Sequence, residues 1–262
     1  MPKLTFSSIF KVFAHRLAGI SPCLKSKMYP ARAIIMQKTV KKLAPIKDLK
    51  DPFTFPFLSA LTKVVLGLWY RRLEVWGIDN LPQTGPFICV ANHSSRFDGP
   101  TLGRLLDRPA NFMVAPTELV GLQGFLLGKV GSFPANPRLD LIEHAIGRFE
   151  LGEPLVIFPE GNVFYDGKTH PFKKGFCKLA FAAIERGLDI PVIPVGICYG
   201  KDLRSAHFNF GQPIRLDPTQ DIKDVANAIH REVLALRAEI GVVADQSALY
   251  GDLGLNRYGV CG

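Results

Sequence analysis

Two side chains that could carry out proton transfer lie close together in the segment 92–98, which reads Asn-His-Ser-Ser-Arg-Phe-Asp. The apolar run 86–91 before it is typical of a buried strand, and the Gly-Pro-Thr-Leu stretch after it is typical of a helix start. His93 at such a turn can take a proton from a hydroxyl near neutral pH when a carboxylate fixes its tautomer. Asp98 is the candidate partner, although it could instead cap the following helix.

A second carboxylate follows another apolar run, in the segment 155–161 with the sequence Leu-Val-Ile-Phe-Pro-Glu-Gly. The Pro-Glu-Gly turn predicts that Glu160 lies where a strand ends. Ligands of open α/β sheets bind outside the carboxyl ends of the strands. We therefore expect His93, Asp98 and Glu160 to line one cleft, with a lysine-paired turn carboxylate as the alternative for Glu160.

These two segments belong to a series of four blocks whose order resembles the glycerolipid acyltransferase family, which includes the 1-acylglycerol-3-phosphate acyltransferases. The resemblance extends over about residues 70–215. The blocks that carry it are Asn92-His93 with Asp98, the segment from Phe133 to Arg138, the segment from Phe158 to Gly161, and the strand from Val192 to Val195.

The resemblance implies a mechanism and a set of site residues. His93 would be the general base that deprotonates a lipid hydroxyl, with Asp98 as its partner in a His-Asp dyad. The hydroxyl would attack the thioester of acyl-CoA or acyl carrier protein without a covalent acyl-enzyme. Arg138 would contact an acceptor phosphate, and the block containing Pro194 would be associated with the acyl donor. The substrate-binding residues that it implies in the four blocks are Asn92, Arg138, Glu160, Gly161 and Pro194.

The third block departs from the family pattern, which usually continues Glu-Gly-Thr-Arg. This chain has Asn162 and Val163 there, so an arginine for phosphate binding is absent at that position. Lys173 and Lys174 could supply the missing charge, because an ammonium group binds phosphate as a point charge. An acceptor without a phosphate stays open as the alternative.

The expected function is acyl transfer to the hydroxyl of a lysophospholipid, above all 1-acyl-sn-glycerol-3-phosphate, giving phosphatidic acid in phospholipid biosynthesis. Another lysophospholipid or a neutral alcohol could be the acceptor instead. Two other classes stay open: a thioesterase, in which the same base activates water, and a non-catalytic lipid-binding protein. The remaining histidines are isolated and show no metal-ligand spacing, so we expect no metal and no cofactor beyond the acyl-CoA or acyl-ACP co-substrate.

The basic residues concentrate at the start of the chain. Residues 1–47 contain ten Lys and Arg and no acid, whereas the whole chain has a net charge of +9. Such a segment suits the surface of an anionic membrane, and the alternatives are a solvated flexible leader or an organelle transit peptide. Nucleic-acid binding is not expected, because no recognition motif accompanies the lysines.

The most apolar stretch, residues 52–70, is interrupted by Pro56 and Lys63 and is too short to span a bilayer. We expect an interfacial helix with Trp69 and Tyr70 at headgroup depth, and a helix packed on the core is the alternative. Five scattered cysteines indicate reduced thiols. The expected location is therefore the cytoplasmic face of a membrane.

Alternating strand and helix patterns in 262 residues predict an α/β fold, with a mixed central sheet flanked by helices and an N-terminal membrane-associating helical segment. Apolar periodicity predicts helices over residues 141–151 and 222–240. The expected organisation is a basic segment (1–50), an interfacial helix (51–75) and an acyltransferase catalytic domain (76–262).

Overall fold

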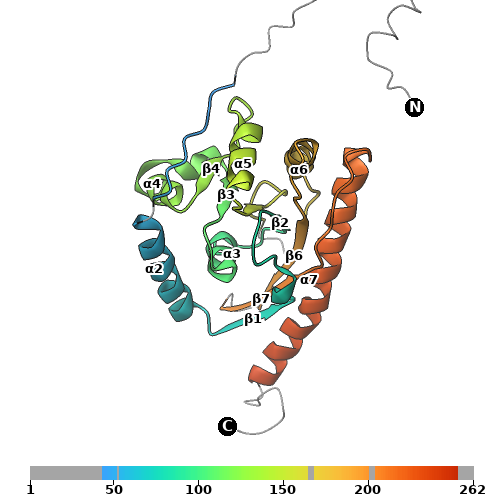
Figure 1. The fold of residues 1–262 in the computed structure, drawn as a ribbon. Helices are drawn as coiled ribbons and strands as arrows, with labels where there is room; N and C mark the ends of the chain where they lie inside the picture. Colours follow the sequence, from blue (N-terminus) through green and yellow to red (C-terminus); the bar gives the residue numbers. More distant parts are fainter. Residues whose placement is uncertain (1–42, 52, 165–167, 201–203, 253–262) are drawn as a thin grey trace, which may run out of the picture. The chain divides into compact units, whose positions relative to one another are not determined.

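The structure is a computed structural model, and it describes residues 43–51, 53–164, 168–200 and 204–252 (Figure 1). The prediction for the basic segment therefore lies mostly outside the described residues.

A seven-stranded mixed sheet forms the centre of the fold, in the order β1-β7-β6-β2-β5-β3-β4. From β6 to β4 the neighbouring strands are parallel, whereas β7 runs antiparallel to β6 and parallel to β1. The predicted mixed sheet is thus confirmed. The strands are β1 (Arg72–Trp76), β2 (Ile88–Ala91), β3 (Asn111–Val114), β4 (Ser132–Pro134), β5 (Leu155–Ile157), β6 (Val192–Tyr199) and β7 (Ser205–Phe210).

Helices cover both faces of this sheet (Figure 1). The α-helices are α2 (Thr54–Trp69), α3 (Asp98–Leu106), α4 (Gly121–Lys129), α5 (Leu141–Glu150), α6 (Gly175–Glu185) and α7 (Ile222–Asp252), and the short 3-10 helices are η1 (Ile78–Asn80) and η2 (Pro116–Leu119). One apolar core packs α5, α6 and α7 against the sheet, and a second packs α2 and α3 against the opposite face.

The central strands of the sheet bury side chains on both of its faces. In β2, Ile88 and Val90 enter the core under α5 and α6, while Cys89 and Ala91 enter the core under α2 and α3. This alternation follows from the two-residue period of a strand. Continuous apolar runs such as β2 are what a strand covered on both sides requires.

The predicted helices formed largely where expected. In α5, the Asp140 side chain accepts a hydrogen bond from the backbone N–H of Glu143 at 3.1 Å and so caps the helix start. In α7, Val225, Ile229 and Val233 form a buried stripe, as the periodicity predicted. The helix continues to Asp252, beyond its predicted end.

Two predicted boundaries differ from the structure. Residues 72–75 were expected in the interfacial helix but belong to β1, which pairs with β7. Residues 43–50 were expected in the basic segment, yet the Lys50 ammonium donates to the Asn111 side chain at 2.7 Å and pairs with Glu153. Both partners lie far along the chain, so local sequence patterns could not indicate them.

The close packing of α7 on β6 can be tested by substitution of Gly196. A Cβ atom at Gly196 would lie 2.4 Å from the backbone N of Arg237 in α7, so Gly196→Ala should force the helix away from the sheet. We expect the free energy of unfolding in urea to fall by about 2 kcal/mol. Gly147 in α5 has open space around its Cα. Gly147→Ala is the control and should stabilise by up to about 1 kcal/mol; equal effects of the two substitutions would contradict the packing described.

Candidate active site

Side chains that can carry out the chemistry lie at the carboxyl ends of three neighbouring parallel strands. Asn92 and His93 follow β2, Glu160 follows β5, and Tyr199 ends β6. The three strands are adjacent in the order β6-β2-β5. The structure therefore brings together, at one sheet edge, blocks that are about seventy to one hundred residues apart, as expected for an open α/β sheet.

His93 and Asp98 are paired in space. The imidazole Nδ1 lies 2.8 Å from Oδ2 of Asp98, whose side chain is fully buried at the first residue of α3. The same oxygen accepts hydrogen bonds from the backbone N–H groups of Ser94 and Ser95, both at 2.8 Å. Asp98 thus organises the turn before α3 as well as the ring, whereas no side-chain hydrogen bond caps the start of α3.

The carboxylate determines which histidine nitrogen can act as a base. An ionised carboxylate only accepts hydrogen bonds, so Nδ1 of His93 carries the proton and Nε2 is left as the acceptor. The ring is held flat against Phe158, with ring centroids 4.1 Å apart and an angle of 15° between planes. The His93 side chain remains 18% exposed, so it can be reached by a substrate.

Tyr199 completes the set of donors to Asp98, and the sequence reasoning missed it. Its hydroxyl donates to Oδ1 of Asp98 at 2.6 Å and lies 3.2 Å from the hydroxyl of Tyr70. Burial, followed by the Asp98 charge, raises the pKa of Tyr199, so its hydroxyl stays protonated and remains a donor. The sequence did contain one signal for this residue, since Tyr199 is an aromatic residue with a hydroxyl group at the end of a predicted apolar strand.

Glu160 is buried beneath the turn that carries His93. Its Oε1 accepts from the backbone N–H of His93 at 2.9 Å, and its Oε2 accepts from the backbone N–H of His170 at 3.2 Å. Burial raises the pKa of this carboxyl, although the two backbone donors oppose the shift. With both oxygens engaged by main chain, Glu160 positions His93, and acceptor binding by this carboxylate stays a prediction.

The side chain of Asn92, just after β2, makes two hydrogen bonds to the main chain of β6. Its Oδ1 accepts from the backbone N–H of Ile197 at 2.7 Å, and its Nδ2 donates to the Ile197 carbonyl at 2.9 Å. The residue is buried. The amide therefore fixes the point at which the chain leaves β2 toward His93, and substrate binding by Asn92 stays a prediction.

The predicted cationic residues differ in their relation to this edge. A Cβ atom at Gly161, which has φ +76°, would lie 2.1 Å from the Lys173 Nζ, so this ammonium covers the Glu160-Gly161 turn. Lys174 is exposed next to it, at the start of α6. Arg138 is exposed after β4, which is separated from β2 by β5 and β3. The structure thus brings Lys173, and not Arg138, to the turn after β5.

Pro194 is buried inside the sheet rather than at its edge. It pairs with Val90 in the register of β2 and β6, and its ring lies against Gly211. In the described part of the chain, no group of three His, Cys, Asp or Glu side chains is arranged to hold a metal ion.

Comparison with known proteins finds similarity to acyltransferases. A family model described as "Acyltransferase" matches residues 72–198, which include β1 and most of β6. The chloroplastic 1-acyl-sn-glycerol-3-phosphate acyltransferase BAT2 of Brassica napus is 24% identical over 200 residues, covering 74% of this chain and 57% of that protein. The human 1-acyl-sn-glycerol-3-phosphate acyltransferase alpha is 26% identical over 198 residues, covering 66% of each chain. The chain thus matches little more than half the length of the Brassica protein.

A solved structure shares the fold. The crystal structure of the 1-acyl-sn-glycerophosphate acyltransferase PlsC from Thermotoga maritima superposes with a TM-score of 0.58 at 18% identity. The match covers 72% of this chain and 79% of PlsC. At this identity the likeness establishes the arrangement of sheet and helices alone.

The buried Glu160 carboxyl predicts a pH dependence of stability. Because its pKa is raised in the folded protein, folding disfavours the ionised form. This cost is absent below the unfolded-state pKa of about 4.3 and grows as pH rises toward the folded-state value. Glu160→Gln removes the charge but leaves one backbone N–H without its acceptor. In urea unfolding from about pH 4 to about pH 8, the variant should lose less stability than the parent as pH rises; a difference independent of pH would contradict this.

Proposed function

Residues 72–198 of this chain belong to the acyltransferase family, and on that premise we propose that the protein transfers a fatty acyl group from an acyl thioester to the hydroxyl of a lysophospholipid. The observation that carries the proposal is the pairing of His93 Nδ1 with the buried carboxylate of Asp98 at 2.8 Å. That pairing makes Nε2 the proton acceptor at an edge of the sheet where ligands of α/β proteins bind.

The proposed reaction needs one base and no covalent enzyme intermediate. His93 Nε2 takes the proton of the lipid hydroxyl as its oxygen attacks the thioester carbonyl carbon. The tetrahedral intermediate then collapses, the carbon–sulfur bond breaks, and the thiolate leaves with the proton that the imidazolium returns. Asp98 stabilises the imidazolium electrostatically and keeps its own four hydrogen-bond donors throughout.

The acceptor that we propose is 1-acyl-sn-glycerol-3-phosphate, which would give phosphatidic acid in phospholipid biosynthesis. The names of the Brassica and human relatives support this choice. Lys173 supports it as well, since its ammonium lies over Gly161, beside Asn162 and Val163, where the family pattern has an arginine. The donor would be acyl-CoA or acyl carrier protein.

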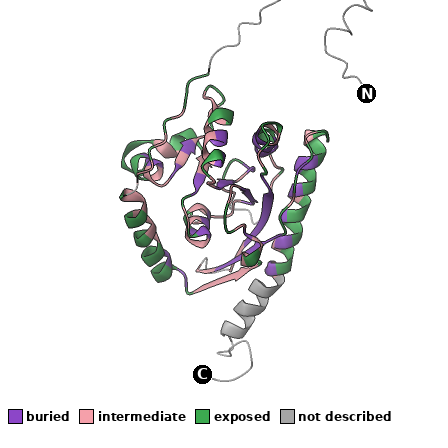
Figure 2. Ribbon diagram, viewed as in Figure 1, coloured by how far each residue is buried: buried purple, intermediate pink, exposed green. Residues whose placement is uncertain are grey.

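We also propose that the reaction takes place at a membrane surface. Large apolar side chains of α2 are exposed, including Phe57 at 67% and Leu68 at 77%, while Leu66 is buried against the core (Figure 2). Residues 53–72 contain three cations and no acid. Among the helices that the structure describes, none is both long and apolar enough to cross a membrane. The buried free thiols of Cys89 and Cys177 support a reducing, cytoplasmic side.

The central test is acyl transfer from labelled acyl-CoA, and separately from acyl carrier protein, to 1-acyl-sn-glycerol-3-phosphate. Removing the base in His93→Gln should lower kcat about a thousandfold, because general base catalysis contributes on that scale. Thermal unfolding of the variant should match the parent. If only another lysophospholipid or a neutral alcohol accepted the acyl group, that acceptor would replace 1-acyl-sn-glycerol-3-phosphate as the proposed substrate. If free fatty acid were the only product, the protein would be a thioesterase. If no combination of acyl donor and acceptor gave a product, a lipid-binding protein would be favoured.

Lys173 predicts a separate effect on acceptor binding. Loss of its charge in Lys173→Ala should raise KM for the phosphorylated acceptor about tenfold, because charge-assisted hydrogen bonds contribute about 1.5 to 3 kcal/mol. The KM for a monoacylglycerol, which has no phosphate, should not change. Lys178→Ala is the matched control, since Lys178 is a nearby exposed lysine within α6, the helix that follows Lys173. Equal effects on both acceptors would contradict phosphate binding by Lys173.

A further inference from the structure

Helix α4 has the reverse of the amphipathic pattern that a water-facing helix shows. Its large apolar side chains face outward, with Leu122 exposed at 75% and Phe125 at 55%, while Gly124 and Gly128 are buried. A Cβ atom at Gly124 would lie 2.1 Å from the Leu119 backbone, so the glycine face packs too closely for side chains. A surface helix normally buries its large apolar residues, and the outer face of α4 therefore suits an apolar neighbour.

Other apolar residues in and next to this helix are also exposed. Val120, which joins η2 to α4, is exposed at 70%, and Leu126 is exposed at 39%. Most other large apolar side chains that are exposed in the described part of the chain lie in or next to α2: Phe53, Phe57, Leu61, Val64, Val65, Leu68 and Trp69. We call the exposed apolar side chains of residues 53–69 and 120–126 the α2–α4 surface.

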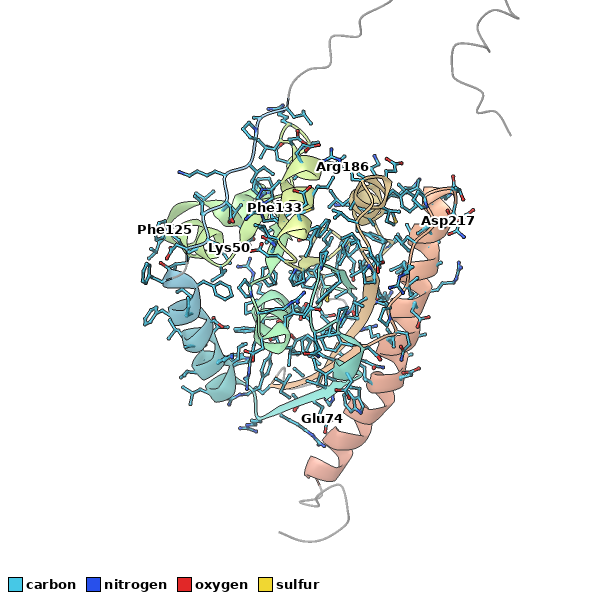
Figure 3. All side chains as sticks on the ribbon, in the orientation of Figure 1. Lys50, Glu74, Phe125, Phe133, Arg186 and Asp217 are labelled. Carbon is cyan, nitrogen blue, oxygen red and sulfur yellow. The ribbon has the colours of Figure 1, made fainter. Side chains whose placement is uncertain are left out.

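A direct contact connects α4 with the segment that leads into α2. The Lys129 ammonium at the end of α4 pairs with Asp51, just before α2, at 2.8 Å. The same ammonium lies 5.5 Å from the centroid of the Phe125 ring. Figure 3 shows Phe125 on the outer side of α4, near the start of α2. The end of α4 therefore lies next to the segment that leads into α2.

The charges around the surface favour an anionic occupant. Arg71 follows α2 and is exposed, and Lys47 is exposed and lines a cavity of about 270 Å³ together with Phe125. Two of the acids at the margin are paired with cations, Asp51 with Lys129 and Asp107 with Lys63. Glu118 of η2 accepts a hydrogen bond from the Gln123 side chain at 2.8 Å instead. Apolar side chains bordered by exposed cations such as Lys47 and Arg71 are what the surface of an anionic bilayer binds.

We infer that α4 and the adjoining Val120 insert into the same lipid leaflet as α2, so that the α2–α4 surface docks the protein on an anionic bilayer. The inference rests on the proposed membrane association of α2 and adds a second, independent contact. One helix leaves the protein free to rotate about that helix, whereas two contacts fix its orientation. η2 begins just after the carboxyl end of β3, the sheet edge that also carries His93. Docking through α4 would therefore turn this edge toward the lipid.

Flotation of the full chain with vesicles of equimolar phosphatidylcholine and phosphatidylglycerol tests the surface without reference to activity. The double substitution Leu122→Ser and Phe125→Ser should lower vesicle partitioning at least about tenfold, because two large apolar side chains would no longer be transferred from water into the lipid. Leu151, exposed at 64% after α5, offers the matched control Leu151→Ser, which should partition as the parent does. Unchanged partitioning of a double variant that melts like the parent would overturn the inference.

Depth-dependent quenching by brominated lipids separates this contact from that of α2. In a background that lacks the native tryptophans (Trp69→Phe and Trp76→Phe), tryptophan introduced by Leu122→Trp should be quenched on vesicles as strongly as one introduced by Leu61→Trp in α2. Tryptophan introduced by Leu151→Trp should not be quenched. Quenching at position 61 alone would leave the membrane proposal standing and overturn the role of α4. If sedimentation without lipid showed a dimer that Leu122→Ser dissociates, with vesicle binding intact, the occupant would be a second copy and the inference would be wrong.

Discussion

The burial of one carboxylate is the constraint on which the site depends. Asp98 is 0% exposed, and its two oxygens receive four donors: the His93 ring, two backbone N–H groups of the same turn, and the Tyr199 hydroxyl. Removing a partner from such a buried group is costly, because the charge would be left without compensation. The turn, the ring orientation and the end of β6 are therefore held in one arrangement, and the imidazole is oriented before any substrate binds.

Support for this carboxylate comes from both neighbouring strands. On one side, Asn92 joins the start of the turn to the main chain of β6. On the other side, Glu160 accepts the backbone N–H of His93 after β5. Tyr70, directly after α2, contacts both Tyr199 and Thr101 of α3 through its hydroxyl. The end of the exposed apolar helix is thus connected to the dyad by two successive hydrogen bonds, which relates the orientation of α2 to the geometry of the site.

Local patterns were sufficient for part of this arrangement. His93 and Asp98 lie within one turn, and the apolar runs of β2, β5 and β6 are continuous, so their positions at a sheet edge could be predicted. The contact between Tyr199 and Asp98 could not be predicted, because it joins residues 101 positions apart through the pairing of β6 with β2. Glu160 was placed correctly at the edge, yet the direction of its carboxylate toward backbone N–H groups depends on tertiary packing. The exposed face of α4 was missed because its apolar composition resembles that of a core helix.

The most direct measurement of the central claim is the tautomer of His93, observed by nitrogen NMR of protein labelled at histidine. The account predicts that at neutral pH Nδ1 carries the proton and Nε2 does not, and that Asp98→Asn abolishes this preference while leaving the other histidines unchanged. A neutral ring protonated at Nε2, or a tautomer unaffected by Asp98→Asn, would contradict the claim that the buried carboxylate prepares His93 to act as a base.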